Sequence, residues 1–181
     1  MNTAIIQRLI DEFTSKKIPF ILIGGLALHF HNYDRQTYDI DFLIDKNNFK
    51  AVVPFLEELG YSLENLQETF ARFDGEKKDL MDFDLMFVDG ETFKAVLRDA
   101  KQVDMGGQSI LVPSLFHLIA LKLHSIKGNP RQREFKDLLD IAELIRKNKI
   151  EVKSTIFQNI LKKYGSQDIY EKIMRYFSED Q

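Results

Sequence analysis

The chain contains no cysteine, which excludes a disulfide framework and a zinc site built from thiolates. It has no apolar run long enough to cross a bilayer, and no basic segment followed by an apolar stretch near its start. Internal repeats and low-complexity segments are absent as well. We therefore expect a globular protein without a signal peptide or membrane contact, located by default in the cytoplasm.

Charge is unevenly distributed along the 181 residues, although the net charge is only −3. Residues 1–120 carry 12 basic and 19 acidic side chains, whereas residues 121–181 carry 13 basic and 9 acidic ones. The acidic excess is compatible with metal ligands, and the basic excess with contacts to phosphate or nucleic acid. An uneven but solvated surface explains such a modest asymmetry equally well.

The hydrophobic pattern divides the chain into a mixed α/β part, residues 1–112, and a helical part, residues 113–181. No linker rich in Pro, Ser or Gly separates the two parts, so we expect them to pack together. Strands are expected at 20–23, 39–45 and from 61, and hairpins at 69–73 with 80–88 and 102–105 with 108–112. Helices are expected at 4–16, 26–30, 47–59 with Asn47 as N-cap, 92–101, from Pro113, 132–148, 152–164 and 168–177.

Residues 21–45 hold a glycine pair and an acidic pair, each beside an apolar strand. Gly24 and Gly25 follow the first strand, and Asp39 and Asp41 begin the second. Side chains alternate along a strand, so the two carboxylates share one face. They repel one another unless a cation lies between them, and Mg²⁺ prefers carboxylate oxygens together with substrate phosphates. The structural alternative, more common for this motif alone, is an edge strand with one solvated face.

A later strand, residues 80–87, carries a second acidic pair on one face, Asp82 and Asp84. If the two strands are neighbours, three carboxylates converge and could hold two divalent ions roughly 3.5–4 Å apart. Asp84 is favoured over Asp82 because it leads directly into an apolar run, as Asp41 does. Gly24 and Gly25 would let backbone N–H groups approach phosphate oxygens, although a glycine pair more often marks a simple turn.

In this order, the motifs resemble those of the polymerase-β-type nucleotidyltransferase superfamily. More narrowly, they resemble the AbiEii-like nucleotidyltransferases of bacterial toxin–antitoxin and abortive-infection systems. In that family a glycine turn precedes an Arg-x-Thr-x-Asp-apolar-Asp motif, and Ala-apolar-Lys-apolar and Lys-Asp-apolar-x-Asp-apolar segments follow. Gly25 departs from the pattern, because many active members carry serine there. The matching residues are Arg35, Thr37, Asp39, Asp41, Lys122 and residues 135–141.

This resemblance implies an α/β (α+β) fold, with a mixed β-sheet and flanking helices followed by a C-terminal helical unit. It implies transfer of a nucleoside monophosphate from an NTP to an acceptor hydroxyl or phosphate. Asp39, Asp41 and Asp84 would hold two Mg²⁺ ions, with Mn²⁺ as the alternative, and Lys122 would contact phosphate or base. The nucleotide-binding residues would be Gly24, Gly25, Arg35, Thr37 and Asp137.

Several alternatives stay open at this point. The acceptor could be RNA (tRNA included), a protein or a small molecule, and a cognate antitoxin could be a partner. A catalytically weak NTP-binding or regulatory protein is the competing function. Arg35 could brace its own loop, and Lys122 could extend to solvent. Asp137 and Asp140 could form structural ion pairs with Lys122 or with nearby arginines.

Overall fold

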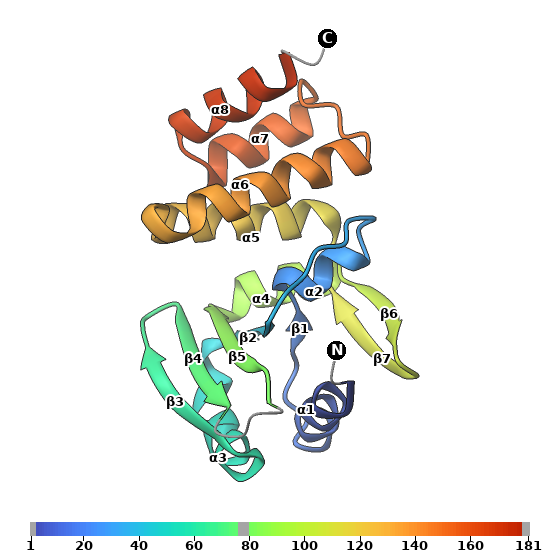
Figure 1. The fold of residues 1–181 in the computed structure, drawn as a ribbon, viewed down its shortest axis with the longest axis vertical. Helices are drawn as coiled ribbons and strands as arrows, with labels where there is room; N and C mark the ends of the chain where they lie inside the picture. Colours follow the sequence, from blue (N-terminus) through green and yellow to red (C-terminus); the bar gives the residue numbers. More distant parts are fainter. Residues whose placement is uncertain (1–2, 76–79, 179–181) are drawn as a thin grey trace. The chain divides into compact units, whose positions relative to one another are not determined.

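The computed structural model describes residues 3–75 and 80–178, which Figure 1 shows as a ribbon. The chain forms two compact units. Unit 1 comprises Met1–Phe30 and Arg35–Ser114, and unit 2 comprises His31–Asp34 and Leu115–Gln181. The chain therefore leaves unit 1 briefly at residues 31–34, returns to it, and leaves again after Ser114.

Unit 1 is built on a five-stranded mixed sheet with the order β1-β2-β5-β4-β3. β1 (Ile21–Leu22) runs antiparallel to β2 (Asp39–Asp45), and β2 runs parallel to β5 (Asp82–Val88). On the other side of β5, β4 (Phe70–Gly75) and then β3 (Tyr61–Leu66) continue the sheet in antiparallel fashion. The two strands that carry the acidic pairs are therefore direct neighbours at the centre of the sheet.

Both expected hairpins form. β4 and β5 pair as predicted for residues 69–73 and 80–88, and residues 76–79, where the sequence predicts the turn, lie outside the described residues. The second hairpin is a separate two-stranded sheet of β6 (Lys101–Met105) and β7 (Gln108–Val112). Its two turn glycines have positive φ angles of 66° and 88°, as a tight hairpin turn requires.

A cluster of phenylalanines fixes which face of the sheet is buried. Phe13, on α1 (Thr3–Ser15), lies with its ring centroid 5.3 Å from that of Phe42 on β2 and 6.4 Å from that of Phe83 on β5. All three side chains are fully buried, and each contributes about 1.5–3 kcal/mol of hydrophobic stabilisation. Slipping β2 by one residue would turn its carboxylates into this cluster, so the register is strongly specified.

The remaining helices of unit 1 follow the sequence pattern with two corrections. The helix expected at 92–101 ends at Arg98, because Lys101 begins β6. Asn47 is not the N-cap of the third helix, because the Asp45 carboxylate accepts the Asn47 N–H and starts a 3-10 turn, η1 (Lys46–Asn48). The α-helix therefore begins later, and Gly60, with φ of 93°, ends it. These helices are α2 (Gly24–His29), α3 (Phe49–Leu59) and α4 (Gly90–Arg98).

As far as residue 178, where the described chain ends, unit 2 contains four α-helices and the short segment 31–34. Pro113 does not open the first of them, because β7 continues to Val112 and the helix begins two residues after the proline, at Leu115. The helices are α5 (Leu115–Gly128), α6 (Pro130–Lys147), α7 (Thr155–Tyr164) and α8 (Gln167–Ser178).

The fold class expected from the sequence is confirmed: a mixed sheet with flanking helices, followed by a helical C-terminal unit. Within the described parts of the chain, none of the helices combines the length and the apolar character needed to cross a bilayer.

Candidate functional site

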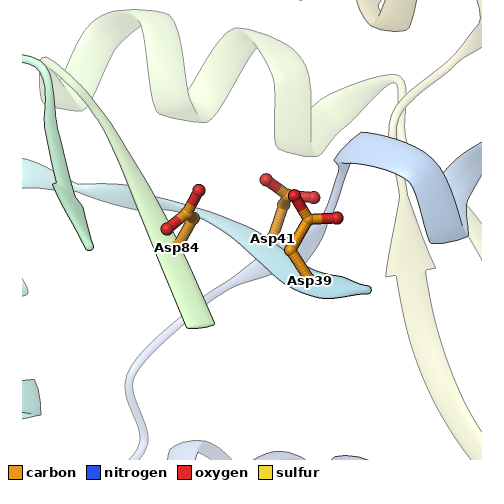
Figure 2. Close-up of side chains that lie close together, drawn as sticks. All are labelled: Asp39, Asp41 and Asp84. Atoms are coloured by element: carbon orange, nitrogen blue, oxygen red, sulfur yellow. The ribbon is translucent and has the colours of Figure 1, made fainter. Parts of the chain in front are cut away.

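The register between β2 and β5 brings three carboxylates together. Asp41 lies directly opposite Asp84 in this parallel pair, and Asp39 lies two residues earlier on β2. One oxygen of each carboxylate lies within 4.8 Å of the others, and Figure 2 shows the three side chains projecting from the same side of the two strands. We call Asp39, Asp41 and Asp84 the acidic triad.

The two candidates for the third carboxylate occupy different environments. Asp84 is only 4% exposed and belongs to the acidic triad. Asp82 pairs in register with Asp39, but its side chain is exposed at the start of β5 and is not part of the triad. Partial desolvation, followed by the negative charge of Asp74, raises the pKa of Asp82. The structure therefore places Asp84 in the triad and Asp82 outside it, and the role of Asp84 as a metal ligand stays a prediction.

The glycine turn packs against the acidic triad. Gly24 has a φ of 64°, and a Cβ built on it would overlap the carboxylate of Asp41. The turn is held to β2 by a backbone hydrogen bond of 2.9 Å, which the Ile23 N–H donates to the Asp41 carbonyl. A glycine is needed here for two reasons, the left-handed backbone and the close approach of the aspartate.

Gly25 faces the two other residues of the motif. A Cβ at Gly25 would lie 2.5 Å from Thr37 Oγ1 and 3.2 Å from Arg35 Nη1. Thr37 Oγ1 in turn donates a 2.5 Å hydrogen bond to Asp39 Oδ1, and Arg35 Nη1 donates to the Gln36 carbonyl at 3.1 Å. The space that a side chain at position 25 would need is therefore filled by Thr37 and Arg35. Thr37 contacts the triad through Asp39, and Arg35 lies beside Gly25.

Replacing Gly24 tests how closely the turn and the triad fit. Gly24→Ala is expected to lower the free energy of unfolding by more than the roughly 1–2 kcal/mol that a left-handed alanine costs, because Asp41 must also move. Gly107→Ala is the matched control, since Gly107 has φ of 88° and no atom within 4 Å of a built Cβ. Urea denaturation of both variants measures the difference. Equal losses would contradict the close fit.

Arg72 is a neighbour of the triad that the sequence motifs did not reveal. It lies on β4, directly opposite Asp84, and binds that carboxylate with two hydrogen bonds. Arg72 Nε donates to Oδ1 at 2.9 Å and Nη2 donates to Oδ2 at 2.8 Å. The hydrogen bonds to Asp84 raise the pKa of Arg72 above its ordinary value, so the guanidinium stays charged. The hairpin bounds expected from the sequence do not set this register, which the structure fixes by pairing Phe73 with Phe83 and therefore Arg72 with Asp84.

Lys122 and Asp137, the two expected site residues from the helical part, lie in unit 2. Lys122 Nζ is 3.1 Å from Asp137 Oδ1 and 2.6 Å from Asp140 Oδ2. The three residues are 5%, 4% and 0% exposed. The structural ion pairing considered for Asp137 and Asp140 is therefore present, with Lys122 as the cation. A contact between Lys122 and phosphate stays a prediction.

The acidic triad suits a divalent cation. Its donor set consists of carboxylate oxygens, which hard cations such as Mg²⁺ prefer. The overlap between a Cβ at Gly24 and Asp41 shows that bare backbone borders this donor set. Among residues 3–75 and 80–178, these three carboxylates lie close enough together to share one ion. Together these features fit a divalent-cation site bordered by main-chain groups.

Three solved structures of similar fold are an antibiotic-resistance factor, an antibiotic adenylyltransferase and a nucleotidyltransferase-like protein. The antibiotic-resistance factor ANT(2'')-Ia superimposes with a TM-score of 0.67 at 12% identity, over 98% of this chain and 97% of its own. The lincosamide antibiotic adenylyltransferase LnuA, with lincomycin bound, has a TM-score of 0.55 at 16% identity, over 77% and 93%. An antigenic nucleotidyltransferase-like protein from Paracoccidioides brasiliensis has a TM-score of 0.55 at 17% identity, over 89% and 85%.

These identities are low and show a common fold. No curated protein sequence matches the chain. One family model does, and it covers residues 1–179, which is nearly the whole chain. By this match and by its fold, the chain belongs to the family described as uncharacterised nucleotidyltransferases.

Proposed function

We propose that this protein transfers a nucleoside monophosphate from an NTP to an acceptor hydroxyl or phosphate, using the acidic triad as its metal site. One observation carries the proposal: Asp39, Asp41 and Asp84 converge from two neighbouring strands beside a glycine turn. A purely structural cluster of three carboxylates would be costly, because like charges this close disfavour one another.

The triad would hold Mg²⁺, in two ions, with Mn²⁺ as the alternative. When bound, such ions neutralise charge on the phosphates and align the attacking and leaving oxygens. The strands fix the three carboxylates before substrate arrives, so little reorganisation is needed on binding. Asp84, the most buried of the three, is held in place by Arg72.

The triphosphate would bind along the glycine turn. The bare backbone at Gly24 and Gly25 permits close approach, and Arg35 adds a positive charge beside Gly25. Thr37 orients Asp39 through its hydroxyl. Lys122 and Asp137, which the motif resemblance assigns to the nucleotide, are held in buried ion pairs within unit 2. Those ion pairs favour a stabilising role within unit 2.

For the acceptor we propose a small hydroxylated molecule or an RNA end. The two antibiotic-modifying neighbours, one with lincomycin bound, support the first class by analogy of fold. The basic excess of residues 121–181 supports the second. A toxin role with a cognate antitoxin, and membership of the AbiEii-like branch, rest on the motif resemblance alone.

The test is transfer of label from each α-³²P-labelled NTP in the presence of Mg²⁺. Parallel reactions would contain total RNA, purified tRNA, an aminoglycoside, a lincosamide or a protein lysate. We expect one acceptor class to become labelled, with release of pyrophosphate and loss of labelling in EDTA. If calorimetry shows Mg²⁺-dependent NTP binding but no acceptor is labelled, the regulatory alternative is favoured. Absence of Mg²⁺-dependent NTP binding would refute the proposed transfer reaction.

A further inference from the structure

Arg72 occupies the side of the acidic triad that faces β4. Its guanidinium holds both oxygens of Asp84 at once, through the 2.9 Å and 2.8 Å hydrogen bonds from Nε and Nη2. This contact is set by the sheet itself, because Arg72 and Asp84 are register partners across two antiparallel strands. Its geometry is the parallel two-point pairing that an arginine makes with a carboxylate.

The pair joins a partly exposed cation to a buried anion. The side chain of Asp84 is 6% exposed, whereas that of Arg72 is 36% exposed. A carboxylate buried to this degree needs a counter-charge, and two further carboxylates, Asp39 and Asp41, lie within reach of the same point. The negative charges of Asp84 and Asp39 both raise the pKa of Arg72.

A divalent ion bound to the triad would supply the same counter-charge. It would need at least one of the two Asp84 oxygens that Arg72 holds. The ion and the guanidinium would then compete for the charge of one carboxylate and repel one another across it. Because Arg72 is partly exposed, it can shift towards solvent while keeping one of its hydrogen bonds.

We propose that Arg72 is a placeholder cation. While the triad is metal-free, Arg72 positions Asp84 and neutralises its charge, and when a divalent ion binds, Arg72 releases one of the two Asp84 oxygens. The inference rests on the proposed metal site. It assigns Arg72 a positioning role, in which binding of the ion is linked to loosening of an internal ion pair. By thermodynamic reciprocity, any change that strengthens the ion pair lowers the affinity for the metal, and metal binding weakens the ion pair.

Arg72→Gln is the variant that separates the two states. Without the guanidinium, the metal-free variant is expected to melt at a lower temperature than the wild type. Saturating Mn²⁺ is expected to reduce this difference in melting temperature. Mn²⁺ affinity, measured on the protein alone by electron paramagnetic resonance, is expected to rise several-fold, up to about tenfold. Arg98→Gln is the matched control, because Arg98 pairs with Asp99 in an exposed site of unit 1. It should leave Mn²⁺ affinity unchanged.

Arg72→Lys keeps the charge and loses the two-point contact. Its Mn²⁺ affinity is expected to lie between those of the wild type and Arg72→Gln, and it serves as the test if Arg72→Gln does not fold. Unchanged or weaker Mn²⁺ binding in either variant would overturn the placeholder role and leave the metal site standing. Failure of the wild-type protein to bind Mn²⁺ would overturn the metal site itself.

Discussion

Asp41→Asn is expected to lower nucleotidyl transfer by about 10³-fold, since a catalytic metal site stabilises the transition state by several kcal/mol and each 1.36 kcal/mol is a factor of ten. Asp41 is the residue on which the site converges, because it faces Asp84 across the strands and touches the Gly24 turn. The amide keeps the shape of the side chain but removes the charge. Initial rates with saturating NTP and acceptor measure the effect.

The same substitution should not weaken the fold. Removing one of three neighbouring carboxylates relieves repulsion, so the melting temperature in EDTA should not fall below that of the wild type. Asp82→Asn is the matched control, because Asp82 lies on the same sheet, two residues before Asp84, with an exposed side chain outside the triad. It should keep wild-type activity. If Asp82→Asn were inactive and Asp41→Asn active, the assigned triad would be wrong.

Lys122→Met is expected to lower the free energy of unfolding by about 3–5 kcal/mol, the usual cost of removing one partner from a buried ion pair. The Lys122 ammonium lies against two carboxylates, and Asp140 is fully buried. The methionine fills a similar volume but removes the Lys122 charge from both aspartates. Within the described residues, Asp137 Oδ2 already lacks a hydrogen-bond partner. The charge of this carboxylate therefore depends strongly on Lys122. Urea denaturation followed by circular dichroism measures the loss.

A second lysine of unit 2 offers a close comparison. Lys172 also contacts two carboxylates, Glu134 Oε1 at 2.5 Å and Asp168 Oδ2 at 2.6 Å, but its side chain is 40% exposed. Solvent screens such pairs, so Lys172→Met should shift the denaturation midpoint far less than Lys122→Met. A Lys122→Met variant with normal stability and a raised KM for NTP would instead favour the predicted contact with phosphate.

The local parts of the site could be predicted because they depend on short-range rules. Alternation along one strand was enough to put Asp39 and Asp41 on the same face, with Ile40 in the core. The two hairpins followed from glycines and polar residues between apolar runs. These features involve residues close in sequence, where side-chain spacing and turn chemistry decide the structure.

The parallel contact between β2 and β5 could not be deduced in the same way. It joins residues more than forty positions apart, such as Asp41 and Asp84, and depends on which strands become neighbours in the sheet. Periodicity says nothing about strand order, so convergence of the carboxylates stayed conditional on it. Arg72 could not be predicted for a related reason. Its position opposite Asp84 follows only from the register of β4 against β5.

The return of the chain into unit 1 after residues 31–34 constrains how this protein can be divided or recombined. Asn148, at the end of α6, donates a hydrogen bond of 2.8 Å to the His31 carbonyl and accepts one of 2.9 Å from Asn32. A fragment beginning at Leu115 would lose both partners. Gene exchange that replaced the helical unit by a single crossover near residue 114 would therefore bring a foreign α6 to the native 31–34 segment. We therefore expect exchange of the helical unit between relatives to succeed when residues 31–34 are exchanged together with the helices.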